Sequence, residues 1–246
     1  MTFTDTHCHL ADPKLASTLP AVLAEAQAAG VARFIVPATS PKDWHSVAQL
    51  ERPSENIHIA LGIHPWFSDG LNEAAFQELE KELIRQPQAW VGEIGLDFYD
   101  KTQTPPQRER QIQVFSRQLA IAQTLRRRVI IHNLKATAGF TQGGIVHAFS
   151  GSVEEARILV KLNFKIGIGS LLLNPNAKKV RTALQALDDT DFVLETDSPF
   201  MLGHETNTPA NIRRIAEIAA ELRGVPLAQL AEITEQNVDS LLHTSP

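Results

Sequence analysis

The chain has 246 residues, of which 43% are hydrophobic and 21% are charged, an ordinary composition for a globular protein. Its formal net charge of −5 excludes the strongly basic surface of proteins that coat nucleic acid non-specifically. A chain of this length fits one large barrel of roughly 250 residues. No linker or repeat divides the chain, so we expect a single domain over residues 1–246.

Apolar strand-like runs alternate with longer segments of helical periodicity, which is typical of βαβ units in a parallel sheet. In chain order, the predicted elements are a strand at Phe3–Thr6, a helix at Leu19–Ala29, a strand at Arg33–Pro37, a helix at Lys42–Leu50, a strand at Ile57–Ile63, a helix at Glu73–Arg85, a strand at Ala89–Ile94, a helix at Pro106–Leu125, strands at Val129–His132 and Gly144–Ala148, a helix at Val153–Leu162, a strand at Lys165–Ile168, a helix at Asn176–Leu187, a strand at Phe192–Thr196, a helix at Asn211–Leu222 and a last helix from Pro226 to about Ser240. The alternation predicts an α/β fold, a (β/α)₈ TIM barrel.

One connection breaks this alternation. Only eleven residues separate His132 from Gly144, so the connection between strands 5 and 6 is shortened and its helix is expected to be short or absent. The densest basic cluster, Arg126 to Arg128, precedes strand 5 and is expected to be solvated surface at the N-terminal end of the barrel.

The compartment follows from what the sequence lacks. No run approaches the roughly 18 apolar residues of a membrane span, and the N-terminus has no basic segment followed by an apolar stretch. The single cysteine, Cys8, cannot form an internal disulfide, which suits a reducing compartment. We therefore expect a cytoplasmic protein without membrane insertion; the sequence shows no sign of an obligate protein partner and does not indicate the oligomeric state.

Five of the nine histidines fall at the C-terminal ends of predicted strands: His7, His9, His64, His132 and His147. In a (β/α)₈ barrel these ends form the active-site face, whichever reaction is catalysed. His7 and His9 are two residues apart, so strand alternation points both rings to the same side. Neutral imidazole binds zinc and other divalent ions. A single His-X-His pair is nevertheless more often surface or core filler, and His132 and His147 could each simply be hydrogen-bonded in the core.

Two acidic residues end apolar strands and need partners there. Asp197 follows Phe192–Thr196, and its alternative role is that of a cap or a salt-bridge acceptor. Glu93 lies between glycines that we expect to leave room for an ion or substrate, and its carboxylate could bridge two metals. Taken together, six ligand-type residues converge on one end of the barrel: His7, His9, Glu93, His132, His147 and Asp197. We expect them to hold two divalent ions, Mg²⁺, Mn²⁺ or Zn²⁺, and the residue types leave the identity of the metal open.

Two neighbouring metals suit phosphoester hydrolysis, because they activate a water and stabilise the attacking and leaving oxygens. The predicted catalytic residues are Asp197, which would orient the water, Glu93, and His64, which would donate to a phosphate or polarise the scissile bond. The alternative for His64 is a loop histidine packed beside Trp66. The remaining histidines are interpreted as structural or solvated: His45, His58, His204 and His243.

The same residues carry a family resemblance. The chain resembles the TatD-type DNases of the amidohydrolase-like barrel superfamily in six motifs: Asp5-Thr-His-Cys-His-Leu10, Leu61-Gly-Ile-His-Pro65, Val91-Gly-Glu-Ile-Gly-Leu-Asp97, Val129-Ile-Ile-His132, Val146-His-Ala-Phe-Ser-Gly-Ser152 and Leu194-Glu-Thr-Asp-Ser-Pro199. The motifs occur in the family order and cover nearly the whole chain. The resemblance implies a divalent-metal nuclease that cleaves DNA from an end, with Glu93 shared between a site of His7, His9 and Asp197 and a site of His132 and His147.

Two departures from the family pattern limit this transfer. After strand 5 the family usually has His-X-Arg-X-Ala followed by a full helix, whereas this chain has Leu134 in place of the arginine. The missing guanidinium removes a bidentate phosphate contact, which Lys135 would replace only in part. The shortened 133–143 segment could also weaken the second metal site. Lys178, Lys179 and Arg181 are the best remaining phosphate contacts, although a solvated helix face is the favoured interpretation for them.

Three functions therefore stay open. The favoured one is a deoxyribonuclease that acts on nucleic-acid ends or single strands through a metal-activated water. The second is a hydrolase of aminoacyl esters, amides or lactones with the same metal site, and the third is a metal-binding homologue with weakened catalysis.

Overall fold

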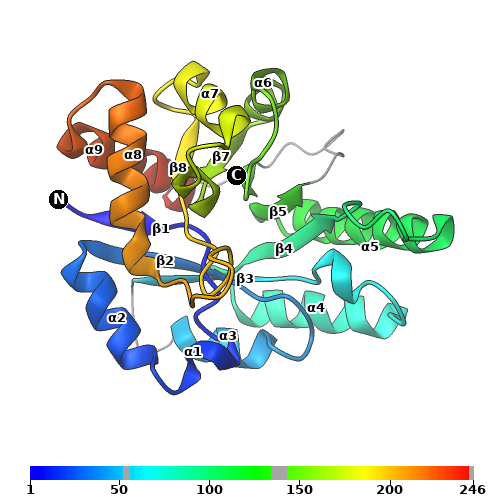
Figure 1. Ribbon diagram of the computed structural model, residues 1–246. Coiled ribbons are helices and arrows are strands. Elements are labelled where there is room, and N and C mark those ends of the chain that lie inside the picture. Colours follow the sequence, from blue (N-terminus) through cyan, green and yellow to red (C-terminus); the bar gives the residue numbers. More distant parts are fainter. Residues whose placement is uncertain (52–55, 134–142, 244–246) are drawn as a thin grey trace.

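Eight parallel strands form a barrel surrounded by helices in the computed structural model (Figure 1). The structure describes residues 1–51, 56–133 and 143–243. Each strand pairs with the next in sequence, in the order β1 (Phe3–Asp5), β2 (Val31–Pro37), β3 (Ile57–Leu61), β4 (Trp90–Leu96), β5 (Val129–Asn133), β6 (Gly144–His147), β7 (Phe164–Ile168) and β8 (Phe192–Leu194). Thr6 N donates to Leu194 O at 3.0 Å, which brings the first and last strands together. The predicted (β/α)₈ barrel is confirmed.

The predicted helices are also present, with ends shifted by a few residues. They are α2 (Leu19–Ala28), α3 (Trp44–Glu51), α4 (Glu73–Arg85), α5 (Pro105–Thr124), α6 (Val153–Lys161), α7 (Lys178–Ala186), α8 (Ile212–Arg223) and α9 (Leu227–Leu242). The sequence did not predict four short elements, namely α1 (Pro13–Ala16), η1 (Pro65–Phe67), η2 (Ser170–Leu173) and η3 (Pro209–Asn211). A single turn is too short to show hydrophobic periodicity.

The barrel interior is apolar at its N-terminal end and carries the polar site at its C-terminal end. Fully buried Ile130, Ile145 and Val193 pack with Val238 and Leu241 of α9, which covers the N-terminal end of the barrel. Side chains two positions apart on a strand point to the same face. The same alternation that places Ile130 and Ile145 inside therefore also directs the residues that follow them, His132 and His147, into the barrel.

The prediction of a solvated basic cluster at Arg126 to Arg128 is wrong for one of its three residues. Arg128 is buried rather than solvated, because its Nε donates to Leu241 O at 2.7 Å beneath the barrel. The connection from β5 to β6 falls on residues 134–142, so the expected loss of the fifth helix, Leu134 and Lys135 lie outside the described residues. Over the described ranges, no helix is long and apolar enough to cross a bilayer.

Candidate metal centre

The chain beyond β1 is held between its neighbours in an extended path. Cys8 N donates to Ile35 O at 3.2 Å on one side, while Asp197 N donates to His7 O at 2.8 Å and His9 N to Ser198 O at 2.7 Å on the other. Cys8 is fully buried in the core, so the residues before and after it point into the barrel. The backbone thus fixes both imidazoles before any ligand binds, and the Nε2 atoms of His7 and His9 lie 3.3 Å apart.

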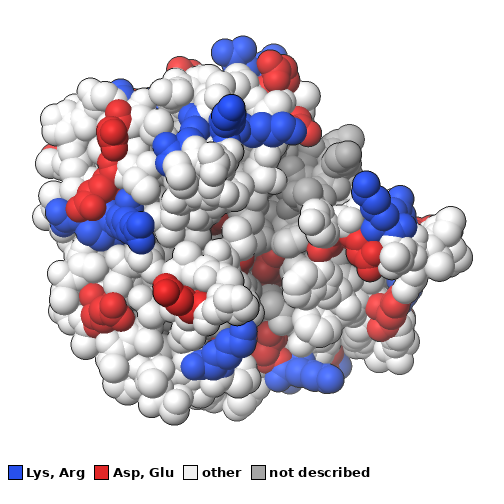
Figure 2. Space-filling view, viewed as in Figure 1, with Lys and Arg blue, Asp and Glu red and all other residues white. Residues whose placement is uncertain are grey.

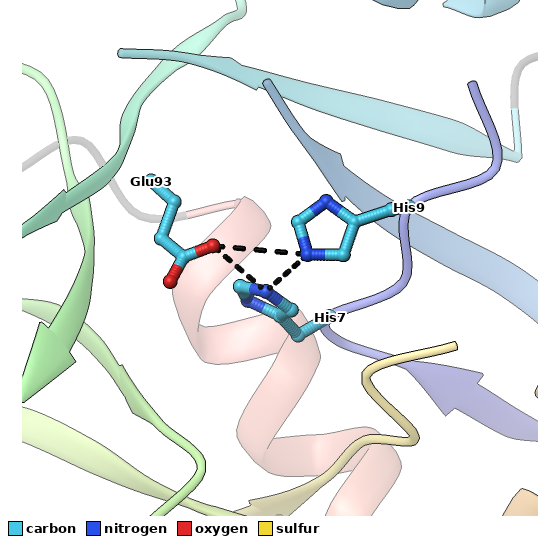
Figure 3. A group of neighbouring side chains, drawn as sticks. All are labelled: His7, His9 and Glu93. Carbon is cyan, nitrogen blue, oxygen red and sulfur yellow. Dashed lines mark hydrogen bonds and ion pairs between the residues drawn. The ribbon is translucent and has the colours of Figure 1, made fainter. Parts of the chain in front are cut away.

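Glu93 on β4 lies at the centre of the cluster, and its two oxygens face different histidines. Its Oε2 atom lies 3.3 Å from His7 Nε2 and 3.7 Å from His9 Nε2, and both rings point toward it in Figure 3. The Oε1 atom lies within 3.4 Å of ring nitrogens of three other histidines: 2.8 Å from His132 Nδ1, 2.8 Å from His147 Nε2 and 3.4 Å from His64 Nε2. One buried carboxylate therefore separates two groups of nitrogen donors.

Asp197 completes the group on the Oε2 side of Glu93. Its Oδ1 atom lies 3.3 Å from His9 Nε2 and 3.7 Å from His7 Nε2. The residue has a φ of +58°, a left-handed conformation that few non-glycine residues adopt. This backbone conformation occurs at the turn after β8, where the chain leaves the barrel. The structure thus brings together all six predicted metal ligands.

Two further carboxylates lie behind the histidines and were not assigned roles from the sequence. His132 Nε2 lies 3.8 Å from Asp97 Oδ2, on the side of the ring away from Glu93. His147 Nδ1 lies 3.8 Å from Glu195 Oε1, which also accepts a hydrogen bond from Ala148 N. Carboxylates behind metal-binding imidazoles fix the ring orientation. Strand alternation could have found both, because Asp97 is four residues after Glu93 and Glu195 is two before Asp197.

Glycines make room for these contacts. A Cβ on Gly167 would lie 2.4 Å from Glu195 Oε2, and a Cβ on Gly95 would lie 2.0 Å from His132 O. A Cβ on Gly92 would lie 2.8 Å from the Cβ of Ile130. The sequence expectation for the glycines beside Glu93 was therefore wrong: the room they leave is filled by strand β5, not by an ion or substrate.

His64 differs from the other histidines in its hydrogen bonding. Gln118 of α5 binds both backbone groups of Ile63, and His64 N donates to Thr39 O at 2.8 Å, which fixes the residue. Its Nδ1 accepts a hydrogen bond from Trp66 N at 3.2 Å. The proton of the neutral ring is then on Nε2, which points toward Glu93. Burial lowers the pKa of His64, so the ring is a neutral donor at neutral pH.

The electrostatics of the cluster favour bound positive charge. Burial alone would raise the pKa of Glu93, but the surrounding histidines, of which His147 has the largest effect, hold this pKa well below its usual range. Burial likewise opposes protonation of His9 and His132, yet Asp197 and Glu93 raise the pKa of His9 to about 9, and Asp97 and Glu93 raise that of His132 to about 10. Burial, helped by His147, lowers the pKa of His7 to about 4.

The donor set fits divalent metal ions. Ring nitrogens only 3.3 Å apart in His7 and His9, and 2.9 Å apart in His132 and His147, converge on carboxylate oxygens. Imidazole with carboxylate is the ligand set of zinc and of other first-row divalent ions. Three overlapping groups could each hold an ion: His7 with His9 and Glu93, His7 with His147 and Asp197, and His64 with Glu93 and His132.

A cavity of about 500 Å³ leads to this cluster from the surface. All the site residues predicted from the sequence line it, except the fully buried His7. None of the described residues in its wall is a lysine or an arginine, while Asp12 and Asp43 add negative charge. Figure 2 shows acidic atoms inside the central hollow and basic atoms around the margin of this face.

The histidines interpreted as structural lie apart from this cavity. His45, His204 and His243 are exposed and His58 is half-buried, and none of them lines the cavity wall. Lys178 and Lys179 are exposed on α7, as expected for a solvated helix face, whereas Arg181 donates to Leu172 O at 3.0 Å.

Comparisons with known proteins agree with this geometry. The family model described as TatD related DNase matches residues 4–243. The uncharacterized metal-dependent hydrolase YjjV of Escherichia coli K12 is 32% identical over 256 residues, covering 98% of each chain. A crystal structure of YjjV superposes with a TM-score of 0.89 at 31% identity, again covering 98% of both chains.

A relative with a named activity is more distant. The 3'-5' ssDNA/RNA exonuclease TatD of Escherichia coli K12 is 29% identical over 257 residues, which cover 96% of this chain and 97% of that protein. Family, fold and site chemistry thus agree on a metal-dependent hydrolase that acts on ester bonds. The chain belongs to the TatD related DNase family.

Proposed function

We propose that this protein is a two-metal phosphodiesterase that cleaves nucleic acid at single-stranded ends. The observation that carries the proposal is the position of Glu93, whose Oε2 atom faces His7 and His9 while its Oε1 atom faces His132 and His147. A carboxylate with donors on both sides is suited to bridging two ions a few ångströms apart. Such ion pairs are typical of enzymes that cut phosphodiesters.

Each proposed metal site draws on its own strands. His7, His9 and Asp197, from the ends of β1 and β8, would hold the first ion with Glu93 Oε2. His132 and His147, from β5 and β6, would hold the second with Glu93 Oε1. Asp97 and Glu195 would keep the two rings of the second site in place from behind.

The reaction adds water to phosphorus and breaks one P–O bond to a sugar, leaving a phosphomonoester and an alcohol. When bound, two divalent ions would lower the pKa of the attacking water and offset the charge on the phosphate. Asp197 has a pKa held below its usual value by the histidines, although burial opposes this, so it is an ionised acceptor for a water proton. His64 would donate its Nε2 proton to a non-bridging phosphate oxygen.

The substrate class is supported by a relative and not by the site alone. The TatD relative is named as an exonuclease on single-stranded DNA and RNA, and two bound ions would supply positive charge to a phosphate in a wall that has no described lysine or arginine. The same lack of basic side chains favours a second candidate, a hydrolase of aminoacyl esters or related uncharged bonds.

The experiment compares substrates on one preparation. Metal-stripped protein is loaded with Mg²⁺, Mn²⁺ or Zn²⁺ and given single-stranded DNA, an aminoacyl ester and a simple phosphodiester. We expect shortening of the DNA from one end, with loss of this activity in Asp197→Asn and His64→Gln but not in the exposed control Asp69→Asn. Ester turnover without DNA cleavage would favour the second candidate, and inertness with bound metal would contradict both.

A further inference from the structure

Large apolar side chains are exposed around the mouth of the metal-centre cavity. Trp66 is 70% exposed, Phe67 45%, Phe200 39% and Met201 46%, and all four line the cavity. Water-exposed aromatic rings at a concave site mark a binding surface, because covering them removes apolar area from water. Among the described exposed Phe, Trp and Tyr side chains, Tyr99 alone does not line this cavity.

The aromatic rings lie on both sides of Glu93. On one side, the ring centroid of Trp66 is 4.9 Å and that of Phe67 is 6.5 Å from the ring of His64, which faces Glu93 Oε1. On the other side, the ring of Phe200 is 5.6 Å from His9, which faces Glu93 Oε2. A chain that passes over the cluster would therefore meet an aromatic ring before and after the reacting bond.

A polar contact orients the ring of Trp66, and a backbone hydrogen bond fixes the main chain that carries Phe200. Trp66 Nε1 donates to Asp97 Oδ2 at 2.6 Å, so the indole is oriented while most of the side chain stays exposed. Phe200 N donates to Asp197 O at 2.8 Å, and Lys14 Nζ lies 4.9 Å from the centroid of its ring. A fixed ring loses little conformational freedom when a ligand stacks on it.

We propose that Trp66 and Phe67 on one side and Phe200 on the other form a base-stacking subsite for single-stranded nucleic acid. This inference rests on the proposed function and specifies how its substrate is held. Aromatic side chains stack on any base, whereas a phosphate backbone is normally held by basic side chains. Outside the histidines of the metal centre, the described wall of the cavity contains aromatic rings and no lysine or arginine, so the bases and not the backbone supply the binding energy there. Bases in a duplex are already stacked on each other, so duplex ends bind more weakly.

A binding experiment tests the subsite independently of turnover. The three tryptophans of the chain are Trp44, Trp66 and Trp90, and the first and last are 4% and 7% exposed. Trp66 is therefore the one that a stacked base can quench. Chelator-treated protein is titrated with a short oligothymidylate and with a matched oligonucleotide whose residues are abasic. We expect quenching and tighter binding with the thymine bases, by about 5- to 150-fold for each base that stacks on a ring.

Substitutions then locate the effect. Phe200→Ala and Trp66→Ala should each weaken binding of the oligothymidylate several-fold and leave binding of the abasic chain unchanged. Trp66→Phe keeps a ring and should restore most of the affinity in a labelled-oligonucleotide assay. Tyr99→Ala is the matched control, because Tyr99 is 85% exposed outside the cavity.

Three results would overturn the subsite: equal affinity for the two oligonucleotides, wild-type affinity in both alanine variants, or an equal loss in Tyr99→Ala. Failure of the proposed function has a different signature. Wild-type protein loaded with metal would then bind oligothymidylate through the rings without cleaving it.

Discussion

The Nδ1 atom of His132 lies 2.8 Å from Glu93 Oε1, and the opposite nitrogen of the same ring lies 3.8 Å from Asp97. His132 thus points its Nδ1 atom into the cluster, while its Nε2 atom faces Asp97. Asp97 also accepts hydrogen bonds from Trp66 Nε1 and Tyr99 N, at 2.6 Å and 2.9 Å. One carboxylate therefore links the metal centre to the exposed indole at the cavity mouth.

Replacing Asp97 tests this link. Asp97→Asn keeps the size of the side chain but removes the charge that faces His132, so we expect metal affinity and hydrolysis to fall by about 10- to 100-fold. Metal titration and steady-state kinetics on one preparation measure both quantities. Asp69→Asn, at an exposed loop position, is the control. Wild-type metal affinity in Asp97→Asn would show that Asp97 does not position His132.

Glu195 has the corresponding role behind His147. Burial raises the pKa of Glu195 to about 7, so its negative charge is largely present only above neutral pH. Glu195→Gln retains an oxygen for the Ala148 N–H but loses this charge, so at pH 8 the protein should fold normally and lose about 10- to 100-fold in metal affinity. Glu195→Ala should in addition unfold more easily, by about 1–3 kcal/mol, because the Ala148 N–H loses its partner. Thermal unfolding and metal titration separate the two effects. An equally stable alanine variant would rule out this contact as a source of stability.

Metal binding should release protons at neutral pH. Neighbouring carboxylates raise the pKa of His9 to about 9 and that of His132 to about 10, although burial opposes both shifts. Both rings are therefore protonated at pH 7 without metal. An ion needs the deprotonated nitrogen. The pKa of His147 is raised as well, by Glu93 and against burial, so titration calorimetry at pH 7 in buffers of different ionisation enthalpy should show release of about two or more protons per chain. A heat that does not depend on the buffer would contradict this protonation state.

Asp5 should make the metal-free protein less stable as the pH rises. Burial raises its pKa to about 8, although Thr196 donates to both carboxylate oxygens. A raised pKa in the folded state contributes stability that is complete below the unfolded pKa, near 3.8, and is lost as the pH rises through 8. Denaturant unfolding of wild type and Asp5→Asn in chelator, from pH 5 to 8, measures this. The wild type should lose stability relative to the variant over that range, and parallel curves would disprove the assignment.

The placement of the metal ligands was predictable because it depends on two short-range rules. Parallel strands bring their C-terminal ends to one face of a barrel, and alternation points His7 and His9 to the same side. Those rules do not reveal which ring nitrogen of His132 faces Glu93, because that depends on rotamers and on Asp97. Nor do they show that Gly92 and Gly95 accommodate a neighbouring strand, since strand-to-strand approach is a tertiary property.

The exposed aromatic side chains at the mouth of the cavity were not predictable for a related reason. Trp66 and Phe67 lie on η1, a single turn, and Phe200 lies in the loop after β8. Hydrophobic periodicity cannot separate an exposed ring in such a segment from a buried one. The exposed fractions and the shared cavity became evident only in the folded chain.

The central claim is that the carboxylate of Glu93 serves two metal sites. The most direct measurement is the number of Mn²⁺ or Zn²⁺ ions bound per chain, by elemental analysis after equilibrium dialysis, for wild type and Glu93→Gln. The claim predicts two ions in the wild type and a loss of affinity at both sites in the variant, with the fold intact by circular dichroism. One ion in the wild type, or two ions bound with unchanged affinity in Glu93→Gln, would contradict it.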